Sequence, residues 1–201
     1  MTNNTPKYTF TSDWFSNNIP LWKRELTRFN TKPIKFLEVG TWEGRSAIWA
    51  LENVLSHPKS HITCVDTFEE PGTLKTFKQN ITAFKDKVTI LKGKSQDMLK
   101  TPGVLEDKGK FDIIYIDADH HSKHRIEDAI LCFPLLKPGG LMIFDDYTNN
   151  KAHDKRCPKP GIDAFLDIYA DDLRVLHTKW QVIIQKRIRP YPKKPCRSEL
   201  Y

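Results

Sequence analysis

Short apolar runs and amphipathic stretches alternate along most of the chain. The apolar runs predict strands, and these occupy residues 34–40, 61–68, 87–93, 111–117 and 139–147. The stretches between them carry apolar residues at helical spacing and predict helices at residues 45–57, 73–84, 95–100, 122–136 and 161–173. Strands that alternate with helices form a parallel sheet covered on both faces. The pattern therefore predicts an α/β fold of the doubly wound kind.

Both ends of the chain depart from this alternation. Residues 14–29 have helical spacing interrupted by Pro20, and they predict one or two short helices rich in aromatic residues. These helices could cover a bound ligand or form an interface. Residues 173–186 predict two strands joined as a hairpin around His177–Lys179. We therefore divide the chain into a helical extension (1–33), a main domain (34–187) and a Pro-rich tail (188–201).

The positive charge of the chain is concentrated in that tail. The 201 residues carry a formal net charge of +7. Residues 186–201 contain six Lys and Arg against one Glu, which is 6 − 1 = +5, so the first 185 residues carry 7 − 5 = +2. A solvated tail is the simpler interpretation, and a contact with phosphates or an anionic surface is the alternative.

The remaining composition points to a globular protein without structural disulfides. No run of 18 apolar residues occurs, so we expect no membrane contact. No Cys-x-x-Cys pair indicates a zinc site, and Cys64 and Cys132 lie in apolar runs that predict core positions. The polar N-terminus lacks the layout of a signal peptide, so we expect a cytoplasmic location.

The first two predicted strands end in residues suited to a ligand. Gly40 and Gly44 lie in the loop after the first strand, where a glycine backbone can approach a ligand closely. Their spacing differs from the dinucleotide fingerprint, which disfavours an NAD-dependent oxidoreductase. Glu38 would suit a ligand with a positive group, and Asp66 at the end of the second strand would suit a ribose diol.

Five motifs in order resemble the class I methyltransferases that use S-adenosylmethionine. They are FLEVGTWEGRSA, VDTF, GKSQDML, FDIIYIDADHH and LKPGGLMIFDDY, and the resemblance covers residues 34–186. The chain is most similar to metal-dependent small-molecule O-methyltransferases of the catechol and sugar-modifying types. This resemblance implies a Rossmann-like methyltransferase fold, with a mostly parallel seven-stranded sheet whose last strand is antiparallel. Residues 34–187 would then be the methyltransferase domain.

The resemblance also implies which residues contact the cofactor. Four groups would do so: the glycine loop for the methionine part, the second strand end for ribose and adenine, a pair after the third strand for adenine, and the fourth strand end. The residues are Glu38, Gly40, Thr41, Gly44 and Ser46, then Asp66, Thr67 and Phe68, then Ser95 and Gln96, and finally Asp117. Ser95 is also suited to capping a helix.

Three carboxylates follow neighbouring predicted strands. Asp117 ends the fourth strand, and Asp145 and Asp146 end the fifth. Adjacent strands lie about 5 Å apart, so these acids should converge and would repel one another without a cation. Oxygen ligands of this kind favour Mg²⁺ or Ca²⁺. The sequence therefore predicts a divalent metal site here.

The residues just after Asp117 are candidates for the catalytic base. Asp119 and His120 are both close, and the sequence does not choose between them. The catechol-type enzymes carry Lys where this chain has His120, so catechol itself is a less expected substrate. His121 and His124 are interpreted as helix-face residues, and Asn149, His153 and Arg156 in the next loop as possible substrate contacts.

These observations predict a metal-assisted O-methyltransferase that acts on a hydroxyl of a small molecule, such as a sugar or a polyphenol. The alternative is a nucleic-acid methyltransferase whose basic tail contacts phosphates. We do not expect a nucleic-acid partner, because the chain lacks the Asn-Pro-Pro-aromatic and Lys-Asp-Lys-Glu signatures of such enzymes. A non-catalytic binding protein is disfavoured by the intact acidic cluster. The sequence leaves a homo-oligomer open.

Overall fold

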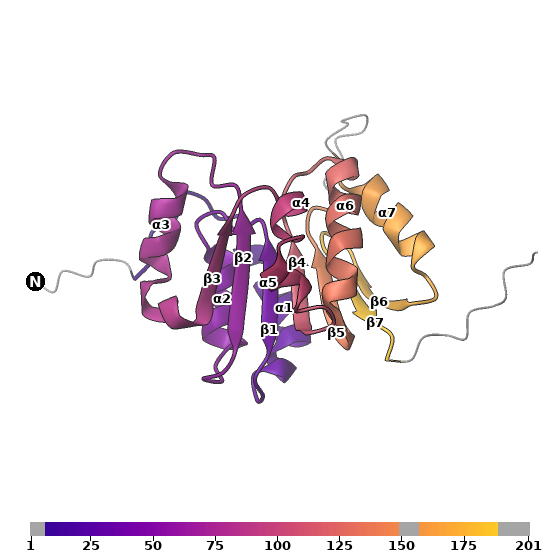
Figure 1. The fold of residues 1–201 in the computed structure, drawn as a ribbon, viewed down its shortest axis with the longest axis horizontal. Helices are drawn as coiled ribbons and strands as arrows, with labels where there is room; N and C mark the ends of the chain where they lie inside the picture. The colour runs from indigo at the N-terminus through magenta and orange to yellow at the C-terminus, as the bar shows by residue number, and fades with distance from the viewer. Residues whose placement is uncertain (1–6, 149–156, 189–201) are drawn as a thin grey trace, which may run out of the picture.

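The computed structural model describes residues 7–148 and 157–188. Seven strands form one sheet in the order β3-β2-β1-β4-β5-β7-β6 (Figure 1). The strands are β1 (Lys35–Val39), β2 (His61–Asp66), β3 (Val88–Lys92), β4 (Phe111–Ile116), β5 (Leu136–Phe144), β6 (Leu173–Thr178) and β7 (Val182–Lys186). β1 to β5 pair in parallel, whereas β7 is antiparallel to both β5 and β6. The predicted doubly wound, mostly parallel sheet is confirmed.

Helices cover both faces of this sheet. One face carries α1 (Ile19–Leu26), α2 (Arg45–Asn53) and α3 (Thr73–Asn80). The other carries α4 (Ser95–Met98), α5 (Pro102–Leu105), α6 (Ser122–Cys132) and α7 (Lys159–Ile168). Four 3-10 segments accompany them: Ser16–Asn18, Thr27–Phe29, Thr82–Lys87 and Phe133–Leu135. Among the described residues, no helix has the length and apolar character needed to cross a membrane.

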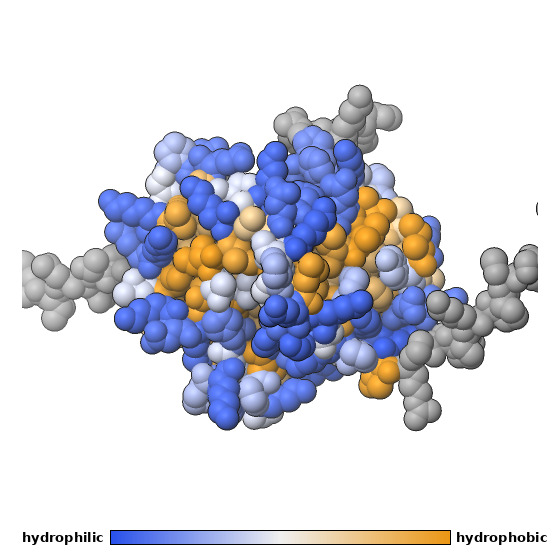
Figure 2. All heavy atoms as spheres, viewed as in Figure 1, coloured by the Kyte–Doolittle hydropathy of each residue, from blue (hydrophilic) through white to orange (hydrophobic). Residues whose placement is uncertain are grey.

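Strand side chains alternate between two hydrophobic cores, as period-2 geometry requires. On β4, Ile113 and Tyr115 face α1 and α2, whereas Ile114 and Ile116 face the α6 side. Trp22 of α1 is fully buried, and its Nε1 donates to Oε1 of Gln181 at 2.9 Å. The helices before β1 thus complete one of the two cores. On the face drawn in Figure 2, hydrophobic residues are gathered on either side of the central column formed by α4 and α5.

The predicted antiparallel hairpin at the end of the domain is confirmed, but two details of the last strands are wrong. The sequence predicts a Pro-Gly-Gly turn before a strand that starts at 139, but β5 begins at Leu136 and contains this stretch. The stretch forms an irregularity, since Phe111 pairs with Leu136 and Ile113 pairs with Leu141. The sequence also predicts the hairpin turn around His177–Lys179, but β6 continues to Thr178 and the turn lies at residues 179–181.

A buried carboxylate lies inside the sheet near the end of β1. The Glu38 side chain is fully buried, and its Oε1 and Oε2 accept hydrogen bonds from the hydroxyls of Ser46 (2.5 Å) and Thr41 (2.6 Å). Burial raises the pKa of Glu38 to about 7, although these hydrogen bonds oppose the increase. Glu38 therefore links β1 to the following loop and to α2.

Gly40, directly after β1, makes a close approach that only glycine allows. Its φ is +87°, and a Cβ at this position would lie 2.2 Å from the carbonyl oxygen of Asp117. Its N–H donates to the carbonyl of Val65 at 2.8 Å, and the N–H of Asp117 donates to the carbonyl of Val39 at 2.7 Å. The ends of β1, β2 and β4 are therefore held at one edge of the sheet.

We predict that Gly40→Ala destabilises the fold more than Gly72→Ala does. Gly72 has a φ of +88°, but no atom lies within 4 Å of the position that a Cβ would take, so its variant isolates the cost of the backbone conformation. That cost is about 1–2 kcal/mol, whereas the added clash at Gly40 should bring its total to roughly 3–5 kcal/mol. Urea unfolding measures both free energies. Equal losses in the two variants would contradict the close approach.

We predict that Glu38 makes the stability of the protein depend on pH. Its folded pKa of about 7 exceeds the unfolded value of about 4.3, so the folded state retains a proton that the unfolded state has lost. Wild-type stability should therefore fall as pH rises between these values. Glu38→Gln keeps partners for both hydroxyls and should gain up to about 4 kcal/mol relative to wild type as pH rises through that range. Urea unfolding at several pH values measures the difference.

The matched control is Glu69→Gln, which changes an exposed carboxylate. Its stability should follow the wild-type pH profile throughout. Parallel profiles for Glu38→Gln and wild type would mean that the folded pKa of Glu38 is not raised.

Candidate functional site

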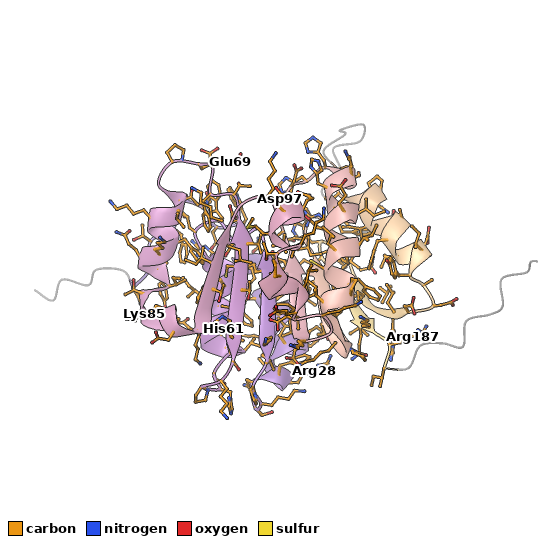
Figure 3. All side chains as sticks on the ribbon, in the orientation of Figure 1. Arg28, His61, Glu69, Lys85, Asp97 and Arg187 are labelled. Carbon is orange, nitrogen blue, oxygen red and sulfur yellow. The ribbon has the colours of Figure 1, made fainter. Side chains whose placement is uncertain are left out.

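A cavity of about 1370 Å³ opens at the edge of the sheet where the parallel strands end. Glu69 and Asp97 mark this edge in Figure 3, and His61 marks the opposite edge. The wall comes from the loop after β1, the ends of β2, β4 and β5, the start of α4, Trp180 of the hairpin, and residues 10–18. Ligands of doubly wound sheets bind at this edge, so this cavity is the candidate site.

The segment before α1 is anchored as one wall of the cavity. The side-chain amide of Asn80 pairs with the backbone of Thr9, accepting at 2.9 Å and donating at 2.7 Å. The carboxylate of Glu43 accepts from the backbone N–H of Thr11 at 2.6 Å. Trp14, 70% exposed, packs on Trp42 with ring centroids 5.7 Å apart. Of the two roles open for this segment, covering the site is the one that its position supports.

Asp66 organises the predicted cofactor half of the cavity. Its Oδ2 accepts from the backbone N–H groups of Thr41 (2.8 Å) and Trp42 (2.9 Å), and its Oδ1 accepts from that of Phe68 (2.7 Å). Trp42 and Phe68 have φ values of +49° and +48°, which non-glycine residues rarely adopt. One carboxylate thus fixes two strained loops at the cavity wall.

Most of the predicted cofactor residues line this cavity together. They are Gly40, Thr41, Ser46, Asp66, Thr67, Phe68, Ser95, Gln96 and Asp117. Glu38 lies behind the wall, where both of its oxygens already bind Thr41 and Ser46. Gly44 is also outside the lining, and it begins α2 with a φ of +85°. In this structure both residues position the loop rather than face the cavity.

Two charged residues beneath the cavity are not evident from the sequence. Arg125 of α6 is fully buried, and its Nη1 donates to the carbonyl of Ile116 at the end of β4. Asp128 is also buried, and its Oδ1 accepts from Gln96 at 3.4 Å. Burial raises the pKa of Asp128 to about 6. The only sequence signal was the presence of two charged residues on the helix face that also carries Ala129 and Cys132.

The carboxylates of Asp117 and Asp145 meet at a buried tyrosine. The hydroxyl of Tyr115 lies 2.9 Å from Oδ2 of Asp117 and 2.5 Å from Oδ2 of Asp145, although it has only one proton to donate. Burial and the neighbouring charge of Asp145 raise the pKa of Asp117 well above its usual range. Burial also raises the pKa of Asp145. The described side chains therefore disfavour two negative charges at this pair.

The group of potential metal ligands in the structure differs from the predicted set of Asp117, Asp145 and Asp146. Asp145 is turned toward Tyr115, whereas Asp117 and Asp146 lie with His120, and their potential ligand atoms are within 4.8 Å of one another. Nε2 of His120 is 2.9 Å from Oδ2 of Asp146, and this contact raises the pKa of His120. Asp146 has a φ of +60°. The sequence indicates His120 as a base but not as a potential ligand.

The carboxylate of Asp119 contacts two other histidines, His121 and His124. Its Oδ1 is 2.5 Å from Nδ1 of His121, and its Oδ2 is 2.8 Å from Nδ1 of His124. Burial opposes ionisation of Asp119, but these contacts prevail and lower its pKa to about 2. A carboxylate with so low a pKa accepts a proton poorly at neutral pH. His124 lies in α6 as predicted, whereas His121 precedes the helix as its N-cap residue, and both are partners of Asp119.

Three predicted substrate contacts, Asn149, His153 and Arg156, lie outside the described residues.

Comparison with known proteins shows the family of this chain. A family model described as a methyltransferase domain matches residues 37–147. The 8-demethyl-8-(2-methoxy-alpha-L-rhamnosyl)-tetracenomycin-C 3'-O-methyltransferase of Streptomyces olivaceus is 25% identical over 139 residues, which cover 66% of this chain and 32% of that protein. Across the curated relatives that it matches, the chain spans between 32% and 54% of their length.

Solved structures share the fold. An O-methyltransferase from Bacillus cereus in complex with SAH is 20% identical, with a TM-score of 0.66 and coverage of 88% of this chain and 84% of that one. MycE of the mycinamycin biosynthetic pathway, in complex with Mg, SAH and mycinamycin VI, is 18% identical, with a TM-score of 0.62 and coverage of 91% and 52%. At these identities the likeness shows the fold alone. With more than half of its residues matched by the family model, the chain belongs to the methyltransferase-domain family and has the class I methyltransferase fold.

Proposed function

We propose that this chain is an S-adenosylmethionine-dependent O-methyltransferase that acts on a hydroxyl of a small molecule, with assistance from a divalent cation. The observation that carries the proposal is that a single cavity joins two chemically different halves. One half is the glycine loop held by Asp66, and the other is the cluster of Asp117, His120 and Asp146. Bound together there, a cofactor and an acceptor would be held at reacting distance.

The cofactor half suits a nucleoside. Oδ1 of Asp66 accepts a hydrogen bond from the backbone of Phe68, and its second lone pair retains the capacity to accept from a ribose hydroxyl. Phe68 lies beside it to contact the adenine, and Ser95 and Gln96 line the wall on the β3 side. S-adenosylmethionine, when bound, supplies the methyl group on its sulfonium.

The acidic half fits a hard divalent cation. Asp117 and Asp146 offer oxygen ligands, and the raised pKa of Asp117 reflects negative charge gathered in a buried place. Asp117 and Asp146 would hold the ion, with Asp145 behind them against Tyr115. Mg²⁺ or Ca²⁺, when bound there, supplies positive charge that lowers the pKa of an acceptor hydroxyl. MycE, in complex with Mg and SAH, shares the fold.

His120 is the base in this proposal. His120 lines the cavity with its Nε2 against Asp146, and its other ring nitrogen, Nδ1, would receive the proton of the acceptor hydroxyl as the oxygen takes the methyl group. Asp119, the other candidate base, is held between His121 and His124. The contacts of Asp119 thus support His120 as the base.

A sugar or polyphenol-like acceptor suits the aromatic wall of the cavity. Trp14, Trp42 and Trp180 all line it, and Trp14 and Trp180 remain largely exposed. Indole faces offer flat apolar surface with a polar edge, which suits ring-shaped hydroxylated molecules. The name of the Streptomyces olivaceus relative describes methylation of a sugar-bearing molecule. A nucleic-acid acceptor remains the less favoured alternative.

The first prediction from the proposed function concerns binding of the cofactor. We expect the purified protein to bind S-adenosylhomocysteine with micromolar affinity, measured by isothermal titration calorimetry. Asp66→Ala should weaken binding by about 10- to 100-fold, because it removes hydrogen bonds to a charged group. Asp97→Ala, at an exposed position near the same edge (Figure 3), should bind like wild type. Absence of binding by the wild type would overturn the cofactor assignment.

The second prediction concerns the cation and the base. We expect chelation with EDTA to abolish methyl transfer to a panel of sugars and phenols, and added Mg²⁺ to restore it. Asp146→Asn should lose the response to Mg²⁺ but keep its affinity for S-adenosylhomocysteine. His120→Gln should lower kcat by about 10²- to 10⁴-fold. Asp97→Asn is the control. Full activity in EDTA would refute the role of the cation while leaving the cofactor result intact.

A further inference from the structure

Three side chains outside the proposed catalytic cluster converge at the rim of the cavity. Asp119 lies between His121 and His124, with oxygen-to-Nδ1 distances of 2.5 Å and 2.8 Å. The potential ligand atoms of all three are within 4.8 Å of one another. Their side chains are 39–47% exposed, so an ion could enter from solvent without opening the core. The geometry brings two imidazoles and one carboxylate to a common point.

The start of α6 fixes this arrangement. His121 is the N-cap residue with an extended backbone, His124 lies in the first turn of α6, and the Nδ1 atoms of both contact Asp119. Oδ1 of Asp119 also accepts from the backbone N–H of His121 at 2.8 Å, which holds the carboxylate against the turn. The two rings lie 5.8 Å apart between centroids. The three side chains are therefore already close to one another without a ligand.

The donor set differs in kind from the neighbouring acids. Asp117, His120 and Asp146 share no member with it, and they provide mainly oxygen ligands. Two imidazole nitrogens and one carboxylate suit Zn²⁺ and other late first-row metals, which Mg²⁺ sites of oxygen ligands do not select. Three protein ligands would leave at least one position for water or another small ligand.

We propose that Asp119, His121 and His124 form a second cation site that takes Zn²⁺ or a similar transition-metal ion. Asp119 and His124 both line the cavity, so an ion there would cross-link the loop between β4 and α6 and add positive charge to the rim. The proposal does not depend on methyl transfer, because it concerns metal binding by the side chains alone.

The test is calorimetric titration of the full chain with Zn²⁺ and, separately, with Mg²⁺. The His121→Gln/His124→Gln double variant should lose one equivalent of Zn²⁺, or bind it at least about tenfold more weakly, and should keep its Mg²⁺ response. The His120→Gln/Asp146→Asn double variant should lose its Mg²⁺ response and should keep the equivalent of Zn²⁺. Because the changed side chains are partly exposed, both variants should fold, and circular dichroism verifies this.

A second readout is thermal stability. Zn²⁺ that binds only the folded state should raise the Tm of the wild type and of the His120→Gln/Asp146→Asn variant, but not of the His121→Gln/His124→Gln variant. A His57→Gln/His177→Gln variant controls for loss of two histidines elsewhere. Equal Zn²⁺ binding by wild type and the His121→Gln/His124→Gln variant would overturn the site. So would loss of all Zn²⁺ binding in the His120→Gln/Asp146→Asn variant, since one shared site would then explain the data.

Discussion

The close approach of Gly40 to the backbone of Asp117 is the constraint on which the site depends. Because there is no Cβ at Gly40, the loop after β1 can lie directly against the end of β4. The backbone N–H of Asp117 donates to Val39 and that of Gly40 donates to Val65. These two hydrogen bonds hold the ends of β1, β2 and β4 at the same edge of the sheet. The cofactor half and the acidic half of the cavity consequently share a wall. If this contact widened, the loop after β1 would move away from the end of β4 and the shared wall would be lost.

The sheet could be predicted because its signals are local. Each apolar run was long enough to be recognised as a strand. The stretches between these runs showed the helical spacing of apolar residues clearly. The wrong predictions occur where local signals conflict with tertiary pairing. Pro138 and Gly139 usually mark a turn, but in β5 they occupy an irregularity that pairing with β4 tolerates. The hairpin turn lies later in the sequence than predicted because β6 pairs with β7 up to Thr178.

The site could be predicted only in part for a different reason. The order of strands placed Asp117, Asp145 and Asp146 at one edge, but side-chain direction depends on packing that no short sequence window encodes. Tyr115 turns Asp145 inward, and His120 takes the position beside Asp146. Asp119 looked like a base from its distance to Asp117 in the sequence. Its pairing with His121 and His124 follows from the way α6 begins.

The anchored segment before α1 has a consequence for how this scaffold can diverge. The segment contributes Trp14 to the cavity, yet it takes no part in the pairing of strands. Asn80 and Glu43 hold it through its backbone at Thr9 and Thr11, and the buried Phe15 anchors it in the core. Trp14, between Thr11 and Phe15, is 70% exposed. Evolution can therefore exchange the exposed side chain at this position, and with it the shape of the cavity wall, while the sheet stays unchanged.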